Sequence, residues 1–295
     1  MNCPTLRGGL QSKKPTANKT SEFHVIEFQQ PEKTGFELRW QIFGITFRVL
    51  PSFFLISALL SGVFVWQVVG NNLVVLAIGI AIDVACIFFA LLFTEFVQGL
   101  VYRSYGLRST VLLQELGGGI YPESPPPTAL QRIVVALAAP ASSFLLFAII
   151  EFSEKEYHWS KTNDYVFFAY IILWVVSLFW GIIGLLPIFP YPGGRVLLEI
   201  LSVVSPRNGL IWTLTISIAM GISYIAYTFA VLYLHQMKPI PLPGGVSLPA
   251  NYLLAIFIGL ATMRNWQLLQ LARSIQGRQR QQDDHDYDDR DRWER

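Results

Sequence analysis

The chain has little charge. Asp, Glu, Lys and Arg make up only 14% of its 295 residues, whereas an ordinary soluble domain has about 25%. The charges also nearly cancel, with 22 basic and 20 acidic residues and a net charge of +2. Scarce and balanced charge argues against a soluble globular protein. It also leaves no basic surface of the kind that binds nucleic acid, so nucleic acid is excluded as a partner.

Cysteine and histidine are also scarce. Cys3 lies in a polar tail and Cys86 in an apolar run, so the two predict neither a disulfide framework nor a metal site. We interpret Cys86 as a small packing residue. Residues 1–22 contain no apolar stretch of the kind that a secretory signal needs, and we expect residues 1–40 to form a polar N-terminal tail.

What the sequence has is long apolar runs, and apolar residues make up 53% of the chain. A helix needs roughly 20 apolar residues to cross about 30 Å of hydrocarbon, and six segments are long enough. These segments are residues 51–69, 73–99, 130–150, 165–188, 208–234 and 247–268. The pattern predicts an all-α polytopic membrane protein whose partner is the lipid bilayer.

The distribution of basic residues predicts the orientation. Nineteen of the 22 Lys and Arg residues fall in the two tails and in the loops on one side of the six predicted spans, and only Lys155, Lys161 and Lys238 fall on the other. Basic residues accumulate on the cytoplasmic side of a membrane. We therefore expect both termini in the cytoplasm, in a bacterial inner membrane rather than an organelle membrane.

The C-terminal segment is strongly polar. Residues 273–295 are rich in Gln, Arg and Asp and poor in apolar residues, a composition that is typical of disorder. We predict a charged, disordered tail there and a six-span membrane domain over residues 41–272.

The second predicted span carries two acidic residues, Asp83 and Glu95. Ionisable residues inside a membrane are costly, and they are usually functional or paired. They are 12 residues apart, or about 18 Å along a helix, so one straight helix cannot bring both to one metal ion. We expect Asp83 to pair with a polar group of a neighbouring helix.

Glu95 belongs to a T-E-F-V-Q segment over residues 94–98. In the H-E-x-x-H motif of zinc proteases, two His residues one turn apart hold the metal and the Glu acts on its water. Here the Glu is present, but its flanking positions are Thr94 and Gln98, whose side chains bind zinc poorly.

Two loops on the predicted cytoplasmic side are rich in Gly or Pro. Residues 116–120 read L-G-G-G-I, and glycines favour close backbone approach, as in a strand edge or a short re-entrant hairpin. Residues 185–195 contain three prolines and two glycines, which cannot continue a straight helix. Non-helical backbone at membrane depth must be buried in protein or line a cavity, so we expect the end of the fourth span to face the end of the second.

Together these motifs resemble the site-2-protease family of intramembrane zinc metalloproteases over about residues 40–270. That family has H-E-x-G-H followed by R-x-[FY]-G, where this chain has T-E-F-V-Q and R-S-Y-G (103–106). It has A-G-P-x-x-N, where this chain has A-A-P-A-S-S (138–143). It has N-L-L-P-x-x-P-x-D-G-G-R, where this chain has G-L-L-P-I-F-P-Y-P-G-G-R (184–195). The F-G-I-T-F-R segment at 43–48 is similar to the family's approach to its first span.

The resemblance implies a zinc site whose ligands are missing. Thr94, Gln98 and Pro192 stand where the family has two His and one Asp, and Gly184 and Ser143 stand where it has Asn. Glu95 stands at the general-base position. The four histidines of the chain are not predicted to compensate, because two lie on the far side of the membrane and two in the tails. We therefore expect neither zinc nor another cofactor.

These features predict an inactive relative of the site-2 proteases, which binds a transmembrane or juxtamembrane segment of a client protein without cleaving it. The predicted groove comprises Gly118, Gly119, Tyr191, Gly193, Gly194 and Arg195. Two alternatives stay open. One is an active intramembrane metalloprotease with an atypical centre. The other is a carrier of a small solute, although the chain does not repeat its broken-helix pattern in two halves.

Overall fold

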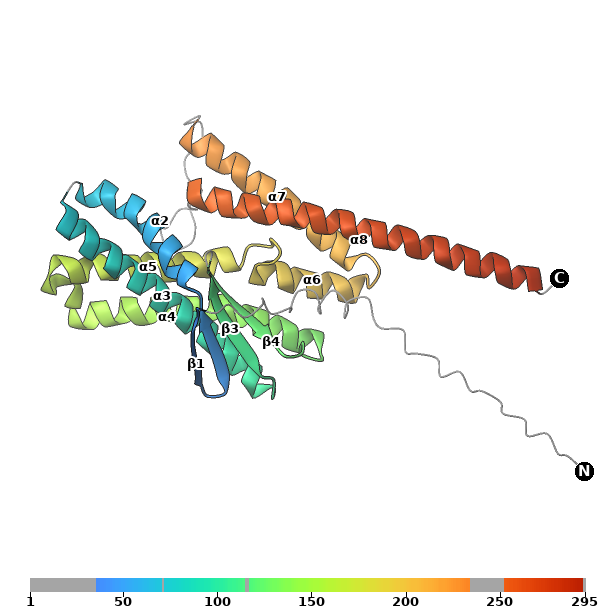
Figure 1. Ribbon diagram of the computed structural model, residues 1–295, viewed down its shortest axis with the longest axis horizontal. Coiled ribbons are helices and arrows are strands. Elements are labelled where there is room, and N and C mark those ends of the chain that lie inside the picture. Colours follow the sequence, from blue (N-terminus) through green and yellow to red (C-terminus); the bar gives the residue numbers. More distant parts are fainter. Residues whose placement is uncertain (1–35, 71, 115–116, 234–251, 294–295) are drawn as a thin grey trace, which may run out of the picture.

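The computed structural model describes residues 36–70, 72–114, 117–233 and 252–293 (Figure 1). The elements in chain order are β1 (Leu38–Ile42), β2 (Ile45–Val49), α2 (Pro51–Val69), α3 (Leu73–Ser104), β3 (Ser109–Gln114), β4 (Gly117–Pro122), α4 (Ala129–Tyr157), the 3-10 helix η1 (Trp159–Thr162), α5 (Asp164–Gly184), α6 (Pro192–Val204), α7 (Gly209–Leu232) and α8 (Tyr252–Trp293).

Among the described residues, four helices, α3, α4, α5 and α7, are long and apolar enough to cross a membrane. The start of each of the first three is fixed by a polar side chain, because Asn72, Thr128 and Asn163 each accept a hydrogen bond from a backbone N–H in the first turn. Such caps satisfy donors that the helix itself leaves unpaired. The predicted fold class, a mostly helical integral membrane protein, is confirmed.

The count of six spans is not confirmed. The predicted first span falls on α2, whose described apolar part, Pro51–Trp66, is shorter than the four spanning helices. The predicted sixth span overlaps the start of α8, and residues 247–251 of it lie outside the described residues. Within α8, Arg264 and Asn265 interrupt the apolar run early, which shortens the part that could lie in hydrocarbon.

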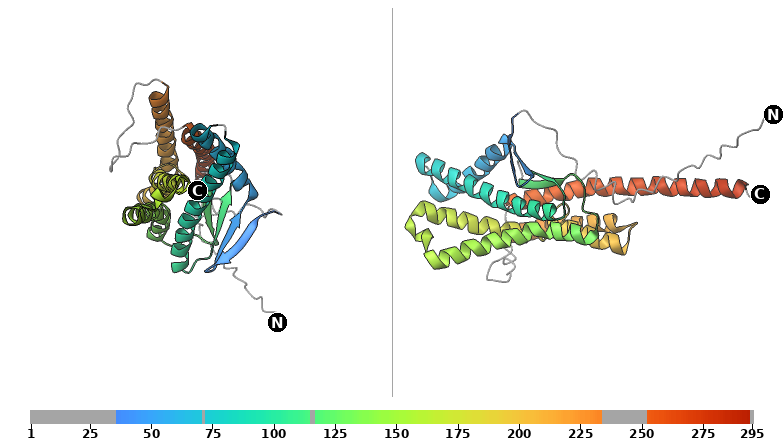
Figure 2. Two further views of the ribbon diagram at one scale, coloured as in Figure 1. Left: turned by 90° about the vertical axis from the view of Figure 1, so that its left-hand side faces the viewer. Right: turned by 90° about the horizontal axis from the view of Figure 1, so that it is seen from below.

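A four-stranded sheet in the order β1-β2-β3-β4 lies on one side of α3, and α4 and α5 lie on the other (Figure 2). The glycine-rich hairpin that the sequence predicted is the antiparallel pair β3–β4. The sequence did not predict the second hairpin, β1–β2, in which Phe43 and Gly44 both have positive φ, as two-residue hairpin turns require. Strands β2 and β3 are parallel and join the two hairpins.

The apolar side of the sheet packs on α3. Ile45 and Phe47 of β2 are 1% exposed, and the ring of Phe47 lies 6.2 Å from that of Phe96 on α3. Gly99 allows this contact, because a Cβ atom there would lie 2.9 Å from Cδ1 of Ile45. The sheet is therefore fixed against the same turns of α3 that carry Glu95.

Helix α8 extends well beyond the rest of the helices (Figure 1). The structure describes α8 through Trp293, and the disorder that the composition predicts from residue 273 stays a prediction. Arg and Gln have favourable helix propensities and the segment contains no proline, so the helix can continue beyond its packed part.

Candidate functional site

Glu95 lies directly under the edge strand β4. Its side chain is 7% exposed, and a Cβ atom on Gly118 would lie 2.7 Å from its Oε1 atom and 2.8 Å from its Cγ atom. Only glycine at this position lets the strand approach the carboxylate so closely. The Oε2 atom is buried and has no hydrogen-bond partner among the residues that the structure describes.

We therefore expect Gly118→Ala to destabilise the protein by about 1–3 kcal/mol, which is the usual cost of overpacking. The cost should disappear when Glu95→Ala is also present, because that change removes the atoms that the new methyl group would meet. Unfolding of the four variants in detergent, followed by circular dichroism, measures this coupling.

Gly119→Ala is the matched control in the same strand. A Cβ atom there would meet only the ring of Tyr121, at 3.4 Å, which is an ordinary contact, so the free energy of unfolding should change little. An equal cost for Gly118→Ala with and without Glu95 would show that β4 does not lie on this carboxylate.

Thr94 is engaged in helix packing. Its Oγ1 atom donates to the carbonyl of Ala90 at 2.9 Å and lies 3.3 Å from Oγ of Ser143 on α4. Both residues are buried, at 5% and 1% exposure. Thr94 and Ser143 thus form a small polar contact between α3 and α4. The resemblance relates Thr94 to a zinc ligand and Ser143 to an Asn.

Gln98, one turn further along α3, also turns to α4. Its Nε2 atom donates to the carbonyl of Val135 at 2.9 Å, and the residue is 4% exposed. Residues four apart share one helix face, and Thr94 and Gln98 both use that face for contacts with the α4 helix.

The third position, Pro192, is the first residue of α6. A Cβ atom on Gly184 would lie 3.8 Å from Cγ of Pro192 and 3.3 Å from Cβ of Pro140 on α4. Gly184 therefore lies between the two proline rings. Thr94 and Gln98 thus contact one stretch of α4, residues 135–143, and Pro192 lies beside Gly184, which itself lies against Pro140 in that stretch.

This donor set does not fit zinc. Zinc in proteins takes Cys, His, Asp or Glu ligands. Here the Thr94 hydroxyl and the Gln98 amide are bonded to neighbouring groups, and Pro192 has no side-chain donor. In the described part of the chain, no three His, Cys, Asp or Glu side chains are grouped so that they could hold a metal ion.

The proline-rich loop between α5 and α6 is held by two later helices. The N–H of Phe189 donates to Oγ of Ser217 on α7 at 3.0 Å, and Nδ2 of Asn265 on α8 donates to the Phe189 carbonyl at 2.6 Å. A Cβ atom on Gly193 would collide with the Leu185 carbonyl, and one on Gly194 with the Phe189 backbone. The glycine pair is therefore what lets α6 begin directly against its own loop.

Tyr191 and Arg195 lie at the start of α6. Tyr191 is the N-cap residue, and burial raises the pKa of its hydroxyl, which keeps it neutral at ordinary pH. The positive charge of Arg195 acts on the Glu95 carboxylate. The assignment of these residues and the glycines to one client-binding groove stays a prediction.

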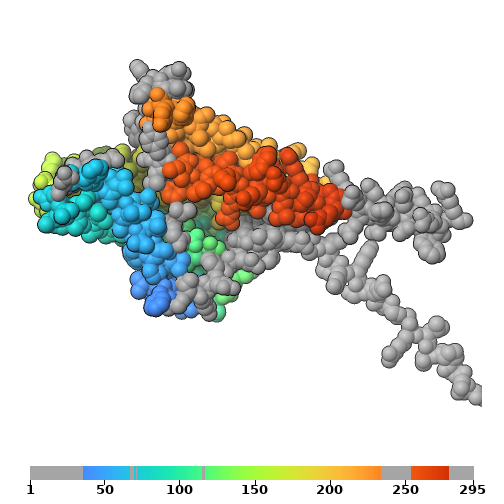
Figure 3. Space-filling model, turned by 45° about the horizontal axis from the view of Figure 1, so that its top comes forward, coloured from blue at the N-terminus to red at the C-terminus, as the bar shows by residue number. Residues whose placement is uncertain are grey.

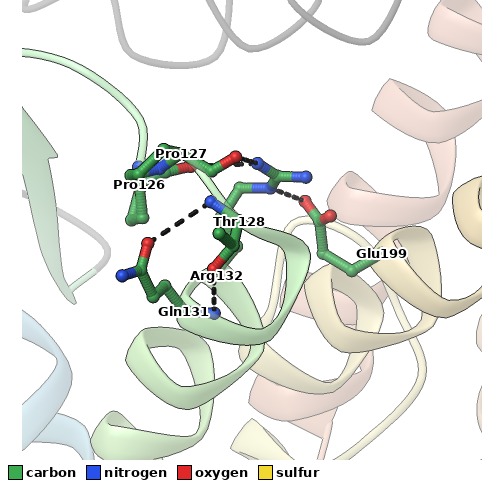
Figure 4. Close-up of polar contacts among 6 residues, drawn as sticks. All are labelled: Pro126, Pro127, Thr128, Gln131, Arg132 and Glu199. Atoms are coloured by element: carbon green, nitrogen blue, oxygen red, sulfur yellow. Dashed lines mark hydrogen bonds and ion pairs between the residues drawn. The ribbon is translucent and has the colours of Figure 1, made fainter.

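A partly buried ion pair that the sequence did not predict joins α4 to α6 (Figure 4). The Nε atom of Arg132 donates to Oε1 of Glu199 at 2.7 Å, and its Nη1 atom donates to the carbonyl of Pro126 at 2.9 Å. Glu199 is 4% exposed. The available signals were an acidic residue in the otherwise uncharged stretch 196–204 and an arginine at the edge of a span, and neither signal identifies its partner.

Asp83 lies nearer the middle of α3 and is 5% exposed. The Ser61 hydroxyl on α2 lies near its carboxylate. Asp83 therefore belongs to the α2–α3 contact rather than to the surroundings of Glu95, and its pairing with a polar group of a neighbouring helix stays a prediction.

Comparison with known proteins finds similarity to solved structures alone. No family model matches the chain, and no curated protein matches it. Among solved structures, the Site-2 Protease from Methanocaldococcus jannaschii aligns with a TM-score of 0.49 and 19% sequence identity, over 79% of this chain and 95% of that chain. A similarity of this size does not assign a family, so the function has to come from the contacts of the site itself.

Proposed function

We propose that this protein is an inactive relative of the site-2 proteases, which binds a membrane-embedded or juxtamembrane segment of a client without cleaving it. The observation that carries the proposal is how the side chains at the three ligand positions are used in the structure. Thr94, Gln98 and Pro192 are packed against neighbouring residues and offer no zinc shell. A lone Glu95 has no metal-activated water on which to act.

Strand β4 and Glu95 offer the means of binding. β4 pairs with β3 on one side, and its other edge has no strand partner in the part of the chain that the structure describes. An extended peptide can add to such an edge through backbone hydrogen bonds. The Glu95 carboxylate lies beneath Gly118 of this strand.

A photo-crosslinker tests the proposal. p-Benzoylphenylalanine in place of Tyr121 on β4 preserves an aromatic side chain at this edge. After irradiation of intact membranes, we expect crosslinks to apolar or juxtamembrane peptides of proteins that remain full length. The same amino acid in place of Gln41, on the opposite edge strand β1, is the control and should not capture those peptides.

The alternatives give different results. An active protease would yield clients cut near the crosslinked peptide, and Glu95→Gln would abolish the cut. A solute carrier would yield no client crosslinks at Tyr121, but would show solute flux in proteoliposomes. Either result would overturn the proposed function.

A further inference from the structure

Helix α3 covers only part of the apolar face of the sheet. The residues facing α3 on β2 are buried, but on the edge strand β1 the same face is open. On this face of β1, the side chains at every second position are apolar. They are Leu38, which is 58% exposed, the half-buried Trp40, and Ile42, which is 44% exposed, and Phe36, two residues before the strand, is 86% exposed. Trp40 stacks on Phe47 with 5.5 Å between ring centroids, so this row continues the buried face outward.

The hairpin lies at the depth of the inner end of α3. The ring of Phe43, at the hairpin turn, is 66% exposed and lies 6.2 Å from that of Phe96, which follows Glu95 in the α3 span. The backbone of Gly44 lies against the Arg103 guanidinium, near the last turn of α3. The β1–β2 hairpin therefore extends sideways from the helices at the depth where the α3 span ends. Figure 3 shows it in dark blue, protruding at the edge of the molecule below α2.

Charge on the hairpin is sorted to suit a membrane boundary. The opposite face of β1 carries the exposed polar residues Arg39 and Gln41. The one buried charge, Arg48, is neutralised by Glu37 through bonds of 2.8–3.1 Å from Nε and Nη2 to both carboxylate oxygens. A buried charge is tolerated in a poorly solvated place only when it is paired in this way.

We infer that the β1–β2 hairpin is a membrane anchor, with the row Phe36, Leu38, Ile42 and Phe43 inserted among the lipid chains of the cytoplasmic leaflet. Apolar area of this extent on an outer edge is costly in water. Further exposed apolar side chains, such as Leu55 and Leu59, follow on α2, which begins directly after β2. A client is the weaker candidate occupant, because β4, the strand over Glu95, is at the other edge of the sheet. The inference does not depend on the proposed function.

Spin labels on β1 test the anchor. In a chain carrying Cys3→Ser and Cys86→Ala, a nitroxide is attached after Leu38→Cys or Ile42→Cys, and in the matched controls after Arg39→Cys or Gln41→Cys. The protein is reconstituted in vesicles of phosphatidylethanolamine and phosphatidylglycerol, and power saturation measures collisions with oxygen and with a water-soluble nickel chelate. We expect oxygen to dominate at 38 and 42 and nickel at 39 and 41, a two-residue alternation.

Two results would overturn the anchor. If nickel dominates at all four positions, the apolar row faces water. If labels at 38 and 42 are shielded from both reagents, another protein or a second copy of this chain covers the row. Because the four positions lie on one strand, a general loosening of the hairpin would remove the alternation rather than imitate it.

Discussion

Replacing Arg132 by alanine is expected to destabilise the membrane domain by about 3 kcal/mol, as is typical when one partner of a buried ion pair is removed. Arg132 donates to Glu199 on α6 and to the carbonyl of Pro126, and side-chain exposure is 21% for Arg132 and 5% for Glu199. The substitution therefore removes a guanidinium from a carboxylate that water reaches poorly. Unfolding in mixed micelles, followed by circular dichroism, measures the loss.

The neighbouring residue supplies the control (Figure 4). Gln131 and Thr128 form a capping box, in which each side chain bonds to the backbone N–H of the other. Gln131→Ala removes one exposed bond of this box and should cost no more than about 1 kcal/mol. The pair Arg132→Met with Glu199→Leu should recover most of the stability, because an apolar pair avoids the desolvation of charge. An Arg132→Ala cost as small as that of Gln131→Ala would mean that the pair does not hold α6 to α4.

The parts of the fold that could be predicted are those that local chemistry decides. Glycines at 117–119 predicted the β3–β4 hairpin, because a glycine run has few other uses, and the prolines at 187, 190 and 192 predicted a break after the fourth span. The β1–β2 hairpin was missed. Its turn, Phe43–Gly44, carries only one glycine, and its parallel partner β3 lies about 60 residues away, beyond two helices. No local pattern specifies such a pairing.

The site was predictable in its positions but not in its contacts. Sequence register placed Thr94, Glu95 and Gln98 on two faces of one helix and left the ligand positions without donors. It could not show that Thr94 hydrogen-bonds to Ser143 and Gln98 to the Val135 carbonyl, because the packing of α4 against α3 creates these contacts. The sequence predicts a cytoplasmic loop where the structure has α6, although Pro192 at the first position of this helix is a common helix start.

The same contacts indicate how a metal site could be built. The combination Thr94→His, Gln98→His and Pro192→Asp is expected to hold about one zinc ion per chain, and the parent is expected to hold none. Positions 94 and 98 already share one face of α3. The Val135 carbonyl and the Ser143 hydroxyl, which now bond Gln98 and Thr94, could accept from the second N–H of each imidazole, the support that metal-ligating histidines usually have. An aspartate at the first position of α6 is favoured by the helix dipole. Elemental analysis after purification in detergent gives the stoichiometry.

The matched control carries the same two histidines with Pro192→Asn, which is nearly isosteric with aspartate but a poor zinc ligand. It should lose most of the metal, and each single substitution should bind zinc weakly or not at all, because one or two donors do not complete a tetrahedral shell. Adding Glu95→Gln to the triple variant should leave zinc in place, since Glu95 is not one of the three donors. Peptide cleavage is not expected to return with the metal, because Gly184 and Ser143 remain at positions where the site-2-protease family has asparagine. A folded triple variant with no more zinc than the parent would mean that position 192 on α6 does not meet positions 94 and 98 on α3. The site assignment would then be wrong, whereas the contacts of α3 with α4 would stand.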